Sequence, residues 1–327
     1  MDKKVKVGLV GVGGMGGCHF QNYENVKDAE LVAVCDVRDD VARKKVGDKN
    51  IRIYSSLEKM LKNEKLDMID ICTPSYLHKD MTLKLINDYH VLCEKPMTLN
   101  AKDAKKISDA ARASKKNFMV AHVVRFMTPY EVLKKEIESK ELGKLIRLDM
   151  KRISAMPRWS WNNWMMDEKL SGGVTTDLSI HDLDFVQSVL GMPDKIDAYR
   201  YVKEENDTIL TTMIYGETLV TCEGTWYNYS VPFQAEFIAV FQNGCVKLDN
   251  GVLYVNGEEY KKAEPVTEEV DLGINVGNDD GYFKEIQYFV DCIVSGKQPG
   301  RVTPESSARS VLLADMVKKK AKLVSKK

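Results

Sequence analysis

Lys95, Asp177 and His181 are the residues best suited to move a proton in this chain. Lys95 lies in Glu94-Lys95-Pro96, directly after an apolar run that predicts a buried strand. A lysine that leaves a buried strand can lose solvation, which lowers its pKa and suits it to proton transfer. The bond before Pro96 can also be cis, which would fix the direction of the lysine. Taken alone, Glu-Lys-Pro is also common at protein surfaces.

Asp177 and His181 lie four residues apart in the segment 171–184. If this segment is helical, the two side chains share one face, and the aspartate can fix the tautomer of the imidazole and support a general base. A base is needed wherever a hydride leaves a carbon and a proton leaves the attached oxygen. Asp182 and Asp184 point elsewhere on such a helix, so capping or solvated roles are expected for them. A metal held by Asp177, His181 and Asp184 is an alternative, but no cysteine or second histidine lies nearby, and we expect no metal.

A glycine-rich turn near the N-terminus could hold a cofactor beside these residues. The apolar run VKVGLV ends in G-x-G-x-x-G, with Gly11, Gly13 and Gly16 in the three glycine positions. The first glycine permits the turn, the second lets the backbone approach a pyrophosphate, and the third lets helix and strand pack closely. Free N–H groups at the start of the next helix, at Gly14 and Met15, would face the phosphates.

A carboxylate follows the second apolar run, Glu30–Cys35, at Asp36. At this point a carboxylate can accept hydrogen bonds from both adenosine ribose hydroxyls, and it repels a 2′-phosphate. Arg38 could pair with that phosphate instead, so we predict a preference for NAD with some use of NADP. A loop with a solvated acid is the alternative interpretation.

Two further segments could border the site. Thr73 and Pro74 follow the third expected strand, so their turn could border the cofactor, although capping of the next helix explains them as well. The segment 157–164 holds three of the four tryptophans. It is either a platform on which indole faces meet the C–H surface of a sugar or a loop pinned by aromatic packing.

Strands and helices are expected to alternate over the first 122 residues, which is typical of a parallel, doubly wound sheet. The expected strands are Lys4–Val10, Glu30–Asp36, Met68–Cys72, His90–Cys93 and Phe118–His122. The expected helices are Gly14–Val26, Asp40–Val46, Ser56–Lys62, Tyr76–Asp88 and Asn100–Ser114, with Ser55 or Ser56 as an N-cap.

The pattern changes after residue 122. A helix at Tyr130–Ser139 is followed by strand-like runs whose turns carry Gly or Asn, which predicts a mostly antiparallel sheet. The runs are Ile146–Ile153, Ile196–Val202, Ile209–Ile214, Leu219–Trp226, Gln234–Gln242, Cys245–Asp249 and Val252–Val255, and the closing helices are Asp280–Ser295 and Pro304–Lys322. We therefore predict an α/β protein with a dinucleotide-binding Rossmann domain at 1–122 and a substrate-binding and oligomerisation α+β domain at 123–327, whose last helix can pack back on the first domain.

Composition narrows the class of protein. The 327 residues are more than one core usually supports, which favours two domains. The 48 basic and 48 acidic side chains balance, so no basic surface points to nucleic acid. Seven scattered cysteines without a C-x-x-C pair are typical of a reducing cytoplasm. No apolar run is long enough for a membrane span or a signal peptide, and neither is expected.

Together these residues resemble the Gfo/Idh/MocA family, which includes glucose–fructose oxidoreductase and inositol 2-dehydrogenase. The similarity spans nearly the whole chain. It rests on the order and spacing of G-x-G-x-x-G, the acidic end of the second strand, Thr-Pro-x-x-x-His, Glu-Lys-Pro, His-Val-Val-Arg-Phe-Met-x-Pro-Tyr and Gly-Gly…Asp-x-x-x-His. The resemblance implies a Rossmann domain and a second domain whose open sheet often forms dimer or tetramer contacts, so we expect a homodimer or homotetramer.

The resemblance also implies roles for single residues. Lys95, Asp177 and His181 become the catalytic set, Glu94 lies near the nicotinamide ribose, and Arg125 borders the cofactor or the cleft. Cofactor contacts are expected from Gly11, Gly13, Gly14, Met15, Gly16, Asp36, Arg38, Thr73, Pro74, His78, Glu94, Lys95 and Arg125. Substrate contacts are expected from Lys95, Trp161, Trp164, Asp177, His181 and Tyr282.

The expected function is that of a cytoplasmic NAD(P)-dependent dehydrogenase acting on a secondary alcohol of a cyclic polyol or sugar. Ser179 and Val174 replace glycines that are common in the family, which weakens assignment to a subfamily. Two alternatives stay open. One is an enzyme that keeps and recycles a bound nicotinamide during glycoside hydrolysis or sugar–sugar oxidoreduction. The other is a non-catalytic NAD(P)-sensing regulator.

Overall fold

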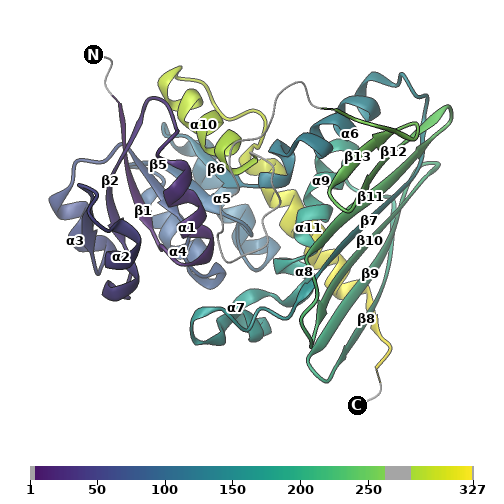
Figure 1. Ribbon diagram of the computed structural model, residues 1–327, viewed down its shortest axis with the longest axis horizontal. Coiled ribbons are helices and arrows are strands. Elements are labelled where there is room, and N and C mark those ends of the chain that lie inside the picture. The colour runs from purple at the N-terminus through teal and green to yellow at the C-terminus, as the bar shows by residue number, and fades with distance from the viewer. Residues whose placement is uncertain (1–3, 262–280, 326–327) are drawn as a thin grey trace. The chain divides into compact units, whose positions relative to one another are not determined.

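The computed structural model describes residues 4–261 and 281–325, which divide into two compact units. The first unit holds residues 4–123 and 281–308, and the second holds residues 124–261 and 309–325. Each unit is built around one sheet (Figure 1). Helix α10 (Gly281–Val294) belongs to the first unit, although it follows the second sheet in the chain.

The described residues of the first unit form a six-stranded parallel sheet in the order β3-β2-β1-β4-β5-β6. Its strands are β1 (Val5–Val10), β2 (Ala29–Cys35), β3 (Arg52–Tyr54), β4 (Met68–Ile71), β5 (His90–Glu94) and β6 (Phe118–Ala121). The order reverses between β1 and β4, and ligands of such sheets bind at the carboxyl ends of the strands beside this reversal. The predicted doubly wound sheet is confirmed.

Helices connect these strands much as the sequence predicts. They are α1 (Gly14–Asn22), α2 (Asp39–Val46), α3 (Leu57–Asn63), α4 (His78–Leu85) and α5 (Ala101–Ala113), with a short 3-10 turn η1 (Ser75–Leu77) before α4. The hydroxyl of Ser56 accepts a hydrogen bond from the backbone N–H of Lys59 at 3.3 Å, so the predicted N-cap of α3 is confirmed.

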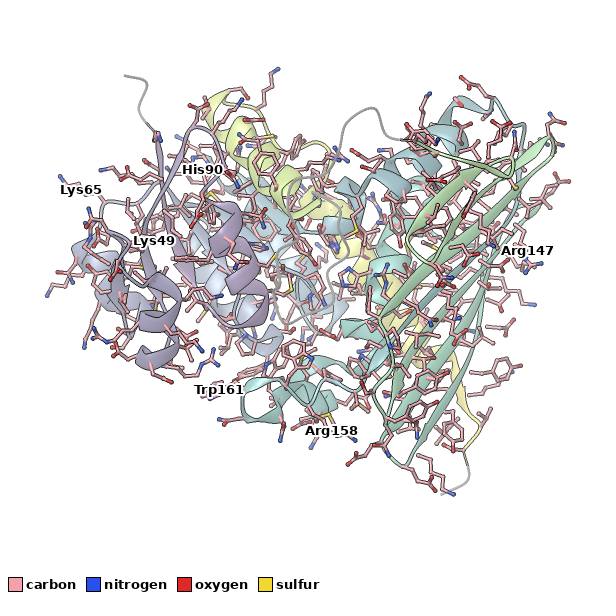
Figure 2. All side chains as sticks on the ribbon, in the orientation of Figure 1. Lys49, Lys65, His90, Arg147, Arg158 and Trp161 are labelled. Atoms are coloured by element: carbon pink, nitrogen blue, oxygen red, sulfur yellow. The ribbon has the colours of Figure 1, made fainter. Side chains whose placement is uncertain are left out.

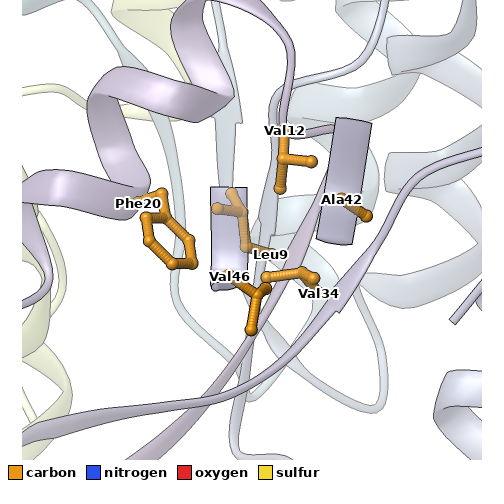
Figure 3. Close-up of a cluster of buried hydrophobic side chains, with 6 residues drawn as sticks. All are labelled: Leu9, Val12, Phe20, Val34, Ala42 and Val46. Atoms are coloured by element: carbon orange, nitrogen blue, oxygen red, sulfur yellow. The ribbon is translucent and has the colours of Figure 1, made fainter. Parts of the chain in front are cut away.

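A cluster of buried apolar side chains joins the first two strands to the first two helices (Figure 3). Its members are Leu9, Val12, Phe20, Val34, Ala42 and Val46. Each large apolar side chain buried in this way stabilises the fold by roughly 1.5–3 kcal/mol. The cluster holds the end of β1 rigidly against α1, and the turn between them is the glycine-rich segment.

The second unit carries a nine-stranded sheet in its described residues, in the order β14-β13-β12-β11-β7-β10-β9-β8-β15. The strands are β7 (Leu145–Ala155), β8 (Lys195–Lys203), β9 (Asn206–Tyr215), β10 (Thr218–Tyr227), β11 (Gln234–Phe241), β12 (Gly244–Asp249), β13 (Val252–Val255), β14 (Glu258–Glu259) and β15 (Ala321–Leu323). The β7–β10 and β8–β15 pairs are parallel and the other described pairs are antiparallel, so the mostly antiparallel sheet is confirmed.

The helices of the second unit lie before β7, between β7 and β8, and before β15 in the chain. They are η2 (Val123–Phe126), α6 (Thr128–Ser139), η3 (Trp161–Met166), α7 (Glu168–Ser171), α8 (Gly173–Asp177), α9 (Ile180–Leu190) and the end of α11 (Pro304–Lys320). The last expected helix was too long, because the chain leaves α11 after Lys320 and pairs with β8 as strand β15. The first residue of the expected helix Asp280–Ser295 lies outside the described residues.

Candidate active site

The glycine turn between β1 and α1 has the geometry of a phosphate cradle. Gly11 has a φ of +85°, and a Cβ atom there would stand 2.6 Å from the carbonyl oxygen of Cys72. A Cβ atom on Gly16 would overlap the carbonyl oxygen of Gly11. Gly13 forms the N-cap of α1 without a side-chain hydrogen bond, so no side chain caps the first-turn N–H groups. These features fit a dinucleotide pyrophosphate at the helix N-terminus.

Asp36 closes the same turn from the end of β2. Its Oδ2 accepts a hydrogen bond from the Val12 backbone N–H at 3.0 Å, and its Oδ1 accepts one from the Arg38 backbone N–H at 2.9 Å. The Arg38 guanidinium also donates to both carboxylate oxygens, at 3.1 Å each. Burial alone would raise the pKa of Asp36, but the hydrogen bonds from Arg38 and Val12 lower it below its usual value. The carboxylate is therefore ionised at neutral pH.

Arg38 bears on the choice between NAD and NADP. Its guanidinium pairs with Asp36, and a Cβ atom on Gly13 would lie 3.1 Å from its Nη2. The arginine therefore lies beside the glycine turn, where a 2′-phosphate would have to compete with Asp36 for it.

His78 ties the turns after β4 and β5 together. Its Nε2 lies 2.9 Å from the carbonyl oxygen of Thr73, and its Nδ1 lies 2.7 Å from that of Pro96. The side chain is buried, and burial lowers its pKa. The ring is then neutral and donates to one of the two carbonyl groups at a time. Both ring nitrogens face backbone, so His78 acts on these turns; its expected contact with the cofactor is untested.

Lys95 follows β5 and is half-buried. Its backbone N–H donates to Oε2 of Glu94 at 2.9 Å, and the Lys95–Pro96 bond is cis, as the sequence allowed. The lysine thus leaves the carboxyl end of a central parallel strand with its backbone held by the preceding carboxylate.

The sequence did not predict a buried polar cluster that includes Glu94, the residue before Lys95. His19 of α1 places Nδ1 2.8 Å from Oδ2 of Asp70 and Nε2 3.1 Å from Oε1 of Glu94. The Tyr23 hydroxyl also donates to Oδ2 of Asp70, at 2.8 Å. The usable signal was Asp70 itself, because a carboxylate inside the apolar strand Met-Ile-Asp-Ile needs a buried partner.

Tyr282 of α10 lies beside this cluster, with its ring centroid 6.4 Å from that of His19. Burial raises the pKa of Tyr282 well above its usual value. The residue is therefore a neutral phenol within the first unit. Its expected contact with substrate remains a prediction.

Asp177 and His181 do not share one helix, so that expectation is wrong. Asp177 is the last residue of α8, Ile180 is the first of α9, and the helix breaks between them at Leu178 and Ser179. Asp177 is buried and His181 is half-buried. The two residues lie on consecutive helices of the second unit.

Asp182 and Asp184 are also not the capping or solvated residues that we expected. Both are buried, and each forms a two-hydrogen-bond ion pair with an arginine. Asp184 accepts from Arg125 at 2.8 and 2.7 Å, and Asp182 accepts from Arg152 at 3.2 and 2.8 Å. The expected role of Arg125 toward the cofactor is untested, but its guanidinium already serves α9.

Two groups of described residues bring His, Cys or carboxylate atoms within 4.8 Å of one another, His19 with Asp70 and Cys72, and His19 with Glu94 and Glu285. Both ring nitrogens of His19 already make hydrogen-bond contacts there, to Asp70 and to Glu94, so we assign no metal to these groups. The Asp177–His181–Asp184 alternative loses its third ligand, because the Asp184 oxygens accept hydrogen bonds from Arg125 and from the Ser310 hydroxyl at 2.6 Å.

The tryptophan-rich segment is exposed at its start. Trp159 and Trp161 are 60% and 40% exposed, while Trp164 is half-buried. Figure 2 labels Arg158 and Trp161, two residues of this segment. Trp159 and Trp161 are thus partly open to solvent, and both interpretations of this segment stay predictions.

Among the described residues, no helix is long and apolar enough to cross a membrane. All seven cysteines lie in the described chain as free thiols, and five of them are buried.

The sequence matches family models in both units. Residues 5–122 match an oxidoreductase family with an NAD-binding Rossmann fold, and residues 130–246 match the GFO/IDH/MocA C-terminal domain. These matches confirm the family resemblance that the motifs indicate.

Similar curated proteins include sugar and inositol dehydrogenases. Glucose-6-phosphate 3-dehydrogenase of Bacillus subtilis is 28% identical over 186 residues, which cover 55% of this chain and 52% of the relative. Inositol 2-dehydrogenase of Pseudarthrobacter chlorophenolicus is 30% identical over 197 residues, covering 58% and 56%. The chain thus spans about half the length of the curated relatives it matches.

Solved structures share the fold over nearly the full length. Scyllo-inositol dehydrogenase from Lactobacillus casei, with bound NAD(H) and scyllo-inositol, has a TM-score of 0.80 at 19% identity over 98% of this chain and 97% of that chain. Likeness at this identity shows the fold alone.

Proposed function

Since the chain belongs to the Gfo/Idh/MocA oxidoreductase family, we propose that it is an NAD-dependent dehydrogenase that oxidises a secondary alcohol of a cyclic polyol or sugar. The observation that carries the proposal is the position of Lys95. It leaves the carboxyl end of β5, and β5 neighbours the strand-order reversal beside which such sheets bind dinucleotides. The inositol and sugar dehydrogenases among its relatives support the substrate class.

Each unit supplies part of the chemistry in this proposal. When bound, the nicotinamide supplies the hydride acceptor. Lys95 polarises the substrate hydroxyl oxygen, and His181 takes the hydroxyl proton. Asp177 favours the protonated imidazole that results. Asp36 holds the adenosine ribose, and the first turn of α1 holds the pyrophosphate.

Substitution of Lys95 tests the proposal. The substrate is first found by an NAD(P)-linked absorbance screen across inositols, aldoses, amino sugars and anhydrosugars. Lys95→Ala is then expected to lower kcat at least 100-fold while the Kd for NADH stays within about twofold, since general acid–base groups contribute about 10²–10⁴-fold. Lys102→Ala, an exposed lysine of α5 in the same unit, is the matched control and should keep full activity.

Three outcomes would contradict the proposal. Near-full activity of Lys95→Ala would show that Lys95 does not act on the substrate hydroxyl. NADH binding without turnover across the whole panel would indicate a regulator. Protein that purifies with stoichiometric nicotinamide and turns over without added NAD would indicate a recycled, tightly bound cofactor.

A further inference from the structure

His19 is held between two carboxylates in the interior of the first unit. Its side chain is fully buried, with Nδ1 2.8 Å from Asp70 and Nε2 3.1 Å from Glu94. Carboxylates only accept hydrogen bonds, and a neutral imidazole has a single N–H to donate. With ionised carboxylates, both contacts are satisfied together only when both ring nitrogens carry a proton, so the geometry favours an imidazolium.

The charges around the ring agree with this assignment. Burial alone would lower the pKa of His19, but the charge and hydrogen bond of Asp70 raise it well above its usual value. Burial alone would raise the pKa of Glu94, but the hydrogen bond and charge of His19 lower it. Glu285 of α10 lies 4.0 Å from Nε2 of His19, and burial raises its pKa well above the usual range. Glu285 is therefore neutral, and the charged partners of His19 are Asp70 and Glu94.

The Glu94 carboxylate contacts both the His19 ring and the backbone of Lys95. Its Oε1 faces His19, and its Oε2 accepts the backbone N–H of Lys95 at 2.9 Å. The carboxylate thus bridges a fixed imidazolium on α1 and the residue that leaves β5. If His19 were absent, Glu94 would be a buried carboxylate without its hydrogen-bonded imidazolium, and it would take up a proton or reorient.

We propose that His19 is a positioning residue for Lys95, acting through the Glu94 carboxylate. This inference rests on the proposed function, because that function assigns to Lys95 the polarisation of the substrate hydroxyl. It links the helix that starts at the glycine turn to the proton-transferring lysine, which is 76 positions further along the chain. His19 itself touches neither substrate nor cofactor in this proposal.

The chain offers a matched pair of variants. His19→Gln removes the contacts to both Asp70 and Glu94, whereas Tyr23→Phe removes a hydrogen bond to the same Asp70 oxygen and leaves Glu94 untouched. Both should cost stability. Only His19→Gln should lower kcat, by at least tenfold on the substrate found in the screen, with the Kd for NADH unchanged within about twofold. Tyr23→Phe should keep the wild-type kcat.

The pH profile separates positioning from a structural role. Glu94 faces His19, Lys95 and His78 as charged or titratable neighbours, with Cys18, Cys72, Asp70, Tyr282 and Glu285 around them. A group with a lowered pKa makes its contribution above that pKa and loses it as the pH falls. His19→Gln should raise the pKa of Glu94, so the acid limb of the kcat profile should move to higher pH. Tyr23→Phe should leave that limb in place.

Two measurements keep the proposal open to refutation. If His19→Gln does not fold, ¹³C-histidine labelling of the wild type reports the ring directly, with the other four histidines assigned by substitution. A signal for His19 that stays in the imidazolium form through pH 8 supports the proposal, and a neutral ring at pH 7 overturns it. If His19→Gln folds, wild-type kcat and an unmoved acid limb overturn it.

The Lys95 variant distinguishes the two proposals. Added to Lys95→Ala, His19→Gln should cause no further loss, and a further tenfold loss would show that His19 acts by another route. If Lys95→Ala is impaired and His19→Gln is not, only the positioning role fails. If Lys95→Ala remains active, the proposed function fails first.

Discussion

The Asp36 carboxylate makes two kinds of contact, one to the glycine turn and one to Arg38. It accepts the Val12 backbone N–H, which holds the glycine turn, and it pairs with the guanidinium of Arg38. An ionised acid at the end of the second strand is the group that binds the adenosine ribose and repels a 2′-phosphate. The same carboxylate therefore restrains the arginine that would otherwise favour NADP.

Replacement of Asp36 should shift the choice of cofactor. Asp36→Ala removes the ribose acceptor and releases Arg38, so the Kd for NADH should rise about tenfold, in line with the loss of a charged hydrogen bond worth about 1.5–3 kcal/mol. The Kd for NADPH should fall. Fluorescence titration of both cofactors measures the ratio. Asp39→Ala, an exposed residue in the first turn of α2, is the control, and an unchanged ratio in Asp36→Ala would contradict the assignment.

The residues that sequence alone could locate share a local signature. Asp36 and Lys95 each follow an apolar strand, and the glycines stand at fixed spacing, so pattern and position suffice. His19 carries no such signature, because its partners lie 51 and 75 residues away and only the parallel sheet brings them together. The environment of Asp177 and His181 likewise depends on a helix break that spacing did not reveal.

Helix α9 is fixed in the second unit by two buried ion pairs. Asp182 pairs with Arg152 of β7, and Asp184 pairs with Arg125 of η2 and with Ser310 of α11. The ring of Tyr130 packs edge-on against Phe185 of α9, and its hydroxyl accepts a hydrogen bond from Arg152 at 3.0 Å. Charged side chains inside this unit thus set how α9, which carries His181, lies against its sheet.

Removal of one charge from this arrangement should destabilise the second unit. Asp184→Asn leaves the Arg125 guanidinium buried without its counter-charge, which typically costs about 3–5 kcal/mol. Asp197→Asn makes the same substitution in an exposed pair and should change stability by less than about 0.5 kcal/mol. All four tryptophans lie in the second unit, so urea unfolding followed by indole fluorescence reports on this unit. Equal midpoints for the two variants would refute the expected role.

Helices and strands with a clear periodicity of apolar residues could be predicted from the sequence. Strands that form only because a neighbouring strand supplies hydrogen bonds could not. The strands of both sheets follow from apolar runs and turn residues. Strand β3 has only three residues, and β15 continues a lysine-rich helix end, so neither has a pattern of its own. Each exists because a neighbouring strand edge supplies its hydrogen bonds.

The chain carries no excess of charge, and several exposed apolar side chains of the described residues lie on the second sheet. Its 48 basic and 48 acidic residues balance, so long-range electrostatic steering toward a polyanion is not expected. Six of these side chains lie on strands of the second sheet, at Ile146, Tyr199, Tyr201, Leu210, Leu219 and Ile238. Tyr199 and Leu210 are direct cross-strand partners, so they share a face of the sheet.

This face is the expected contact between copies of the chain. An exposed apolar surface on a sheet is costly in water and marks an interaction site. Light scattering coupled to size exclusion should therefore give a dimer or tetramer. Leu210→Glu puts a charge directly opposite Tyr199 and should shift the measured mass toward that of the monomer. Lys135→Glu, a substitution at an exposed position of α6, should leave the mass unchanged. A wild-type chain that elutes as a monomer at micromolar concentration, or a Leu210→Glu variant of unchanged mass, would show that this face does not join the copies.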